Sequence, residues 1–441
     1  MTFEKYYSKF LWLLLLVIFR MLLDYYYQVF SDVFDYYGMI WNPRSYWEIL
    51  LSYLLLVVIG AFIPFKGNRA SNLILILLFL FCYVPAGTLF SYNQHHLAFA
   101  FLGLSMVFLS LPIILKINFL KCEFKTQYFK LSAFKVLIFS VTIVSVCSII
   151  CAFGFSFQSE GLSDIYNLRA DYKSATNRFL TYLFSWQTHI ISSAIVLVAI
   201  IRRQLILLFI AILLELYFFT VGGHKSVLLL IPFLFWIIFG LKYWKNNFAL
   251  YALGTLLMMM GTLFLFDIQQ GEFSMVSSIF IRRNLLMPAQ LFFNYADFFS
   301  HNSYDYFAQS FPFELFYDSN YAIDIPEIIG DKYLIEGRNI HANGNIFADL
   351  FANIGLWAFP FSIAFFAILL KLMNAVSLHR NLLFTHTLLA TSVISLMNSG
   401  FIVNLITHGL LLSILLVALF PKTKFVFRDK KSHANHRISA S

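Results

Sequence analysis

The segment TVGGHKS, at 220–226, carries residue types that suit the binding of a phosphate. Gly222 and Gly223 interrupt an apolar run and expose backbone N–H groups, and His224 and Lys225 open the next run. N–H groups at a helix N-terminus attract anions, and an ammonium adds a full positive charge. We therefore predict a phosphate cradle here. A tight turn followed by an interfacial lysine is the alternative interpretation of the same residues.

Five arginines form a second group with a possible chemical role. They lie in two polar stretches between apolar runs and are Arg169, Arg178, Arg282, Arg283 and Arg338. A guanidinium is planar, always charged and able to bind two phosphate oxygens at once, which suits pyrophosphate. Together with Lys225 these arginines are predicted to bind an anionic ligand. For each single arginine, an ion pair with a loop carboxylate is the alternative.

A polar stretch runs directly into an apolar one at 339–360, with the sequence NIHANGNIFADLFANIGLWAFP. His341 lies in this stretch, close to Arg338 and just before the apolar run. An imidazole can transfer a proton near neutral pH, or it can donate a hydrogen bond to a phosphate oxygen. We predict a catalytic role for His341, against the alternative of a structural histidine.

Two acidic residues lie inside apolar runs. Glu215 precedes the paired glycines by roughly two helical turns, where a carboxylate is costly unless it faces a polar cavity or a partner. A structural pair with a cation such as Lys225 and a role in catalysis both stay open for Glu215. Arg20 and Asp24 are four residues apart in the first apolar run, and this spacing predicts a pair within one helix.

The elements that position these residues are predicted from composition. Of the 441 residues, 60% are hydrophobic, 19% are aromatic and only 12% are charged. Soluble proteins have about a quarter of their residues charged. Apolar blocks of roughly 20 residues, enough to cross a bilayer as a helix, recur along the whole chain. We predict an all-α polytopic integral membrane protein with 1–441 as a single membrane domain. DNA-binding proteins and secreted disulfide scaffolds are excluded, and no nucleic acid is expected as a partner.

The apolar blocks and their charged flanks predict about twelve membrane-spanning helices. Their ranges are 10–30, 46–65, 72–91, 97–117, 133–156, 181–201, 204–221, 226–243, 248–266, 346–373, 382–401 and 403–420. The predicted loops include two long ones, at 157–180 and 267–345, and a tail follows at 421–441. Within the second loop, Pro288 and the aromatic residues after it predict a helix lying at the membrane interface.

The distribution of cations predicts the orientation in the membrane. With a cytoplasmic N-terminus, about two thirds of the Lys and Arg residues lie on the inner side, as the positive-inside rule requires. Both termini are then cytoplasmic, and the two long loops with the arginines lie outside. The four cysteines show no metal spacing, and the common nucleotide-binding, zinc-protease and serine-hydrolase motifs are absent. We therefore expect neither a metal nor a cofactor.

Three stretches resemble the O-antigen polymerases, the Wzy-type oligosaccharide repeat unit polymerases of bacterial surface polysaccharide assembly. They are FFTVGGHKSVLLL at 218–230, IRRNLLMPAQLFFNYADFFSHN at 281–302 and HANGNIFADLFANIGLWAF at 341–359. The last stretch also resembles the His- and Asn-containing segment of the related O-antigen ligases. The predicted helix number and loop placement are similar to those of the polymerases along the whole chain.

This resemblance implies a membrane-embedded, metal-independent glycosyltransferase of the GT-C class. Such an enzyme transfers a growing glycan from undecaprenyl pyrophosphate to a new lipid-linked repeat unit, at the periplasmic face of the inner membrane. The product is O-antigen or capsular polysaccharide. Donor, acceptor and membrane lipid are the implied partners, with a chain-length regulator left open. His341 and Glu215 are the candidates for activating the acceptor hydroxyl, and the cations are candidates for binding the pyrophosphate.

Two other functions stay open. An O-antigen ligase would transfer the finished chain to a lipid core, and the RR, Pro, Tyr and DFF pattern at 282–299 favours the polymerase over it. A lipid-linked oligosaccharide flippase or another transporter would move its substrate without chemistry. A flippase needs cations inside its helices along a central cavity, whereas most cations of this chain are predicted in loops.

Overall fold

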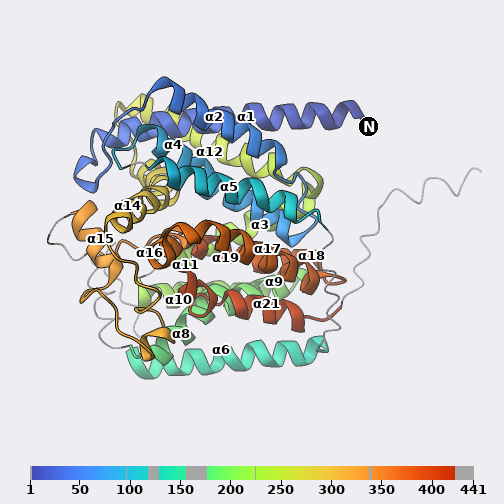
Figure 1. The fold of residues 1–441 in the computed structure, drawn as a ribbon. Coiled ribbons are helices and arrows are strands. Elements are labelled where there is room, and N and C mark those ends of the chain that lie inside the picture. Colours follow the sequence, from blue (N-terminus) through green and yellow to red (C-terminus); the bar gives the residue numbers. More distant parts are fainter. Residues whose placement is uncertain are drawn as a thin grey trace, which may run out of the picture.

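The computed structural model describes residues 2–95, 97–117, 129–154, 176–223, 225–335, 337 and 340–422. In this part of the chain the regular secondary structure is helical, and the single β interaction is an isolated bridge between Trp41 and Asn93. Long helices lie side by side in a bundle, and the N-terminus lies at the same end of the bundle as the C-terminal end of the last helix (Figure 1).

Within the described ranges, eight helices are long and apolar enough to cross a membrane, and four shorter apolar helices lie among them along the chain. Each of these helices coincides with one of the predicted spans. The protein is therefore an all-α polytopic integral membrane protein, as predicted. Bilayer thickness sets the length of a membrane-spanning helix, so the length of each apolar block was enough to predict its position.

The helices fall into three groups along the chain. The first group is α1 (Thr2–Ser31), α2 (Tyr46–Phe62), α3 (Ala70–Leu78), the π-helical η2 (Phe79–Tyr83), α4 (Val84–Tyr92), α5 (Ala98–Ile114) and α6 (Leu131–Phe153). The second is α8 (Arg178–Trp186), the π-helical η3 (Gln187–Ile191), α9 (Ser192–Arg202), α10 (Leu205–Gly222), α11 (Lys225–Tyr243) and α12 (Phe248–Gln270). The third is α16 (Ile346–Ile354), η7 (Gly355–Trp357), α17 (Ala358–Ser377), α18 (Leu382–Ala390), α19 (Ser392–Leu396), α20 (Phe401–Leu405) and α21 (Leu410–Leu419).

The predicted long loop at 267–345 is itself largely helical. It contains α13 (Met275–Ser277), the π-helical η5 (Ser278–Leu286), α14 (Met287–His301) and α15 (Ile325–Tyr333). Pro288 lies in the first turn of α14, so the helix start predicted there is confirmed. Most residues of α14 are buried, because the helix packs against α16 and α4. Its aromatic side chains therefore pack largely against protein.

One end of the bundle carries α14, α15 and the connection at 32–45, and we call it the cap end (Figure 1). It lies opposite the N-terminus, and the other end is called the base end. At the base end the connections 63–69 and 244–247 meet, since the backbone N–H of Gly67 donates to the carbonyl of Lys245 at 2.8 Å. The positions of the predicted site residues are given relative to these two ends of the bundle.

The pair predicted within α1 is present and belongs to a larger buried network. The Arg20 guanidinium lies 2.6 Å from the Asp24 carboxylate. Asp24 also accepts hydrogen bonds from the hydroxyls of Tyr53, at 2.6 Å, and Thr88, at 2.8 Å. A charge pair in the membrane is stable when its remaining polar capacity is satisfied, and α2 and α4 supply those partners. The network therefore joins three helices.

Candidate active site

Arg282 and Arg283 lie on η5 at the cap end. η5 is held against the end of α12, because Asp267 accepts hydrogen bonds from the backbone of Ser274, at 2.8 Å, and from the hydroxyl of Ser277, at 2.6 Å. Nine consecutive residues of η5 are π-helical, a conformation that is rare and is frequent at functional sites. Both arginines therefore lie on one short helix at the cap end.

The Arg282 side chain is held in place by aromatic rings. Its guanidinium carbon lies 3.9 Å from the centroid of Phe34 and 5.7 Å from that of Tyr37, and its Nε donates to Ser278 Oγ at 3.0 Å. Such cation–π contacts fix a guanidinium without neutralising its charge. Arg283 is exposed, and within the described residues no carboxylate pairs with it. The two together present positive charge at the cap end.

Arg178 has the alternative role that the sequence analysis left open. It begins α8 and forms an ion pair with Glu314, and its guanidinium lies 6.0 Å from the ring centroid of Phe311. Glu314 belongs to the same predicted loop as Arg282. It is so far from Arg178 in sequence that no local pattern could predict the pair. This exposed ion pair makes Arg178 a weaker candidate for binding a ligand anion than Arg283.

His341 is exposed at the cap end, on the segment that leads into α16. Its neighbour Ala342 is fixed on both sides, since its N–H donates to Pro326 O at 2.8 Å and its carbonyl accepts from the Tyr295 hydroxyl at 3.0 Å. Asn345 then caps α16 by accepting from two backbone N–H groups at 3.0 Å each. A fixed backbone with an exposed imidazole suits contact with an external substrate.

Glu215 is buried within α10, whereas His341 is exposed on the segment before α16. Glu215 is only 1% exposed in α10, roughly 10 Å from the end of that helix at Gly222. Among the described residues, neither carboxylate oxygen of Glu215 has a hydrogen-bond partner. A polar side chain close to it is that of Ser192 of α9. No hydrogen bond or ion pair within the described ranges joins Glu215 to His341, so the structure does not bring the two predicted catalytic residues into one constellation.

The other predicted cations lie outside what the structure describes. Arg169, His224 and Arg338 fall outside the described residues. Lys225 is the first residue of α11, but its side chain is likewise outside the description. The predicted phosphate cradle and the predicted pair of Lys225 with Glu215 therefore stay predictions.

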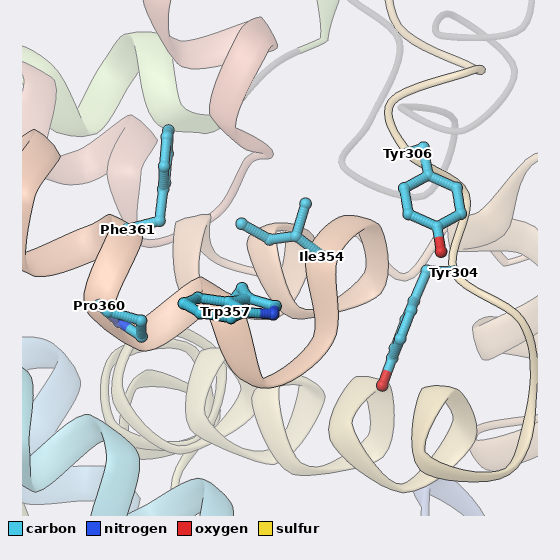
Figure 2. Close-up of a pocket in the computed structure, with 6 residues that line it drawn as sticks. All are labelled: Tyr304, Tyr306, Ile354, Trp357, Pro360 and Phe361. Carbon is cyan, nitrogen blue, oxygen red and sulfur yellow. The ribbon is translucent and has the colours of Figure 1, made fainter.

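A pocket of about 600 Å³ opens beside η7. It is lined by Tyr304, Tyr306, Ile354, Trp357, Pro360 and Phe361. Figure 2 shows the two tyrosines on one side and the residues of α16, η7 and α17 on the other. Trp357 is 76% exposed. Flat aromatic faces with hydroxyl groups at their edge suit an amphipathic ligand.

A polar cluster that the sequence analysis missed lies at the cap end. Asp297 of α14 accepts a hydrogen bond from the Tyr333 hydroxyl of α15 at 2.6 Å. The same carboxylate oxygen lies 3.7 Å from Nδ1 of His95, in the short connection between α4 and α5. The only local signals were a His-His pair in a predicted outer turn and an acidic residue within an aromatic helix. Neither indicates that the three residues meet.

In comparisons with known proteins, no protein-family model, curated protein or solved structure matches this chain. The family suggested by the three resembling stretches therefore stays a prediction. Function has to be inferred from the chemistry of the residues at the cap end.

Proposed function

We propose that this protein is a membrane-embedded glycosyltransferase that polymerises lipid-linked oligosaccharide repeat units into O-antigen or capsular polysaccharide. The observation that carries the proposal is the pair Arg282 and Arg283 on η5, with one guanidinium fixed over Phe34 and the other exposed. These arginines lie within a stretch that resembles the O-antigen polymerases. They lie where a bundle that spans the membrane ends, which is where the pyrophosphate of a lipid carrier would lie.

The proposed reaction needs charge stabilisation more than any other contribution. As the bond between the donor sugar and undecaprenyl pyrophosphate breaks, negative charge builds on the departing phosphate oxygens. Preorganised cations stabilise that charge, and arginine does so without a metal. His341, exposed at the same end, is placed to donate to a phosphate oxygen or to accept a proton.

The pocket beside η7 supports a second binding position. A polymerase must hold two lipid-linked glycans at once, and proximity of two substrates accounts for much of the rate enhancement in such reactions. The Trp357 and Tyr304 rings offer faces on which a sugar ring or an isoprenoid chain can pack. The pocket is lined by other residues than those that surround Arg282, so donor and acceptor can occupy separate positions.

The proposal includes a location. The chain would lie in the bacterial inner membrane with both termini in the cytoplasm and the cap end in the periplasm. The positive-inside distribution of Lys and Arg supports this orientation, as does the position of the base end with its connections at 63–69 and 244–247.

Deletion of the gene tests the proposed function. Without the protein, surface lipid should carry a single repeat unit and no ladder of longer chains, because export and ligation continue. Complementation with the wild-type gene should restore the ladder. Loss of every repeat unit from the surface would overturn the polymerase in favour of a ligase or a flippase.

A transporter has one observation in its favour, since ionisable residues within membrane helices often mark transport pathways. Glu215 of α10 is buried and has no hydrogen-bond partner among the described residues. Purified protein in vesicles separates the two functions. Chain growth from lipid-linked repeat units in the absence of any gradient supports the enzyme, and movement of substrate without chain growth supports the transporter.

A further inference from the structure

His95, Asp297 and Tyr333 form a built arrangement at the cap end, from three elements far apart in sequence. The His95 ring lies edge-on to the Tyr333 ring, with 5.0 Å between centroids. The imidazole is 31% exposed and the carboxylate of Asp297 is 24% exposed, so the cluster reaches the surface. The backbone at His95 is fixed, since its N–H donates to Asn93 Oδ1 at 2.8 Å.

The carboxylate determines how the imidazole is presented. Asp297 Oδ2 lies 3.7 Å from Nδ1 of His95, beyond direct hydrogen-bonding distance, and its negative charge on that side favours the tautomer with the proton on Nδ1. The lone pair is then on Nε2, which no described residue occupies with a hydrogen bond. Asp297 is itself fixed by the hydroxyl of Tyr333 at 2.6 Å. A histidine oriented by a carboxylate, with its second nitrogen open, is the arrangement of a general base.

The charges around His95 agree with this arrangement. Three groups on two helices face the imidazole: Asp297 on α14, and Lys332 and Tyr333 on α15. Burial lowers the pKa of His95 below its ordinary value of 6.5, Lys332 lowers it further and Asp297 raises it. The imidazole is therefore neutral at neutral pH. Burial and Asp297 raise the pKa of Tyr333, so the phenol keeps its proton and continues to donate to Asp297.

We infer that His95 is a catalytic base that accepts the proton of a substrate hydroxyl through Nε2, with Asp297 as the residue that positions it. The inference rests on the proposed function, in which the hydroxyl belongs to the acceptor sugar. Nε2 takes the hydroxyl proton as the oxygen forms a bond to the anomeric carbon of the donor. The bond from that carbon to the pyrophosphate breaks, and its electron pair leaves with the lipid pyrophosphate. Lys332 lies close enough to influence the imidazole electrostatically and adds a positive charge beside the site.

The test is the pH dependence of chain growth by purified full-length protein in vesicles, with a lipid-linked repeat unit as substrate. His95→Gln should lower kcat about 100-fold or more with little change in KM, because an amide of similar size cannot accept the proton. The acidic limb of the wild-type profile should report His95, with activity present above its pKa and lost below it. In His95→Gln that limb should disappear from the residual rate.

Two charge variants give opposite shifts that a merely structural role would not produce. Asp297→Asn removes the charge that raises the pKa of His95, so the acidic limb should move to lower pH while kcat falls. Lys332→Met removes a charge that lowers this pKa, so the limb should move to higher pH. The matched control is His379→Gln, an exposed histidine in the connection between α17 and α18, which should leave rate and profile unchanged.

A His95→Gln protein that is folded and retains the wild-type rate, or an acidic limb that both charge variants leave in place, would overturn the inference. If His95→Gln fails to fold, the opposite shifts of the acidic limb in Asp297→Asn and Lys332→Met still test the inference. Absence of chain growth with wild-type protein would instead overturn the proposed function, and with it the acceptor hydroxyl as the group on which His95 acts.

Discussion

Arg282 carries a positive charge whose position is fixed by the Phe34 ring and by Ser278. Its fork should make charge-assisted contacts with a phosphate worth about 1.5–3 kcal/mol, so Arg282→Ala should lower the rate of chain growth roughly ten- to a hundred-fold. Arg282→Lys should retain part of the rate, since it keeps the charge but loses the planar fork. The measurement is polymer formed by purified protein in vesicles. Arg69→Ala, an exposed arginine at the base end, is the control, and an equal loss there would contradict the assignment.

His341 is expected to act as a hydrogen-bond donor to a phosphate oxygen, because the structure gives the oriented carboxylate to His95 and not to His341. His341→Gln should then retain most of the activity, since an amide also donates. His341→Ala should lower the rate about ten-fold or more, because the hydrogen bond to the anionic phosphate oxygen is lost. Both rates are measured with lipid-linked repeat units. A fully inactive His341→Gln beside an active His95→Gln would transfer the role of base to His341.

A change of Glu215 to Gln shows whether the function of the protein requires the buried carboxylate. Glu215 has no hydrogen-bond partner among the described residues. Burying such a carboxylate destabilises a fold, and an amide of the same shape removes most of that penalty. Glu215→Gln should therefore unfold at the same temperature as the wild type or a higher one, with chain growth retained. The melting temperature in detergent and the polymerisation rate are the measurements. A stable Glu215→Gln protein without activity would make Glu215 a catalytic residue.

At the scale of elements, the junction between α14 and α16 determines how the cap end is built. Asn345 caps α16 through two backbone N–H groups, and its amide donates to Pro288 O at 3.0 Å. Loss of a helix cap costs about 1 kcal/mol, and the unpaired Pro288 carbonyl adds about 1–3 kcal/mol. Asn345→Ala should therefore lower the melting temperature more than Asn381→Ala, which removes a cap with one N–H contact at the start of α18. Equal shifts in thermal unfolding would contradict this role of the junction.

At the scale of the whole molecule, the orientation of the bundle determines which face can meet lipid-linked sugars. A reporter fused within the connection at Lys245 should be cytoplasmic, and a reporter at Asp318 should be periplasmic, because the cations concentrate at the base end. Alkaline phosphatase and a cytoplasm-active reporter distinguish the two positions. A cytoplasmic signal at Asp318 would place Arg282 on the face opposite to the proposed substrate. A fusion after Tyr306, in the same connection, should agree with the one at Asp318.

Local sequence is sufficient to predict the membrane-spanning helices and the start of α14. A span is a local property, since about 20 apolar residues must satisfy their own backbone hydrogen bonds in lipid. A proline in the first helical turn is local as well, and so is the spacing of Arg20 and Asp24 on one helix. Such features depend on neighbours in the chain, so residue order is enough to predict them.

The contacts between side chains of different helices could be found from the fold alone. Asp297 lies close to His95 and Tyr333 because α14 packs beside the α4–α5 connection and α15, and Arg178 pairs with Glu314, which is also far from it in sequence. Glu215 is left without a hydrogen-bond partner among the described residues for the same reason. These contacts depend on how helices pack across the bundle. Packing is set by the whole set of buried surfaces, and no single stretch of sequence contains it.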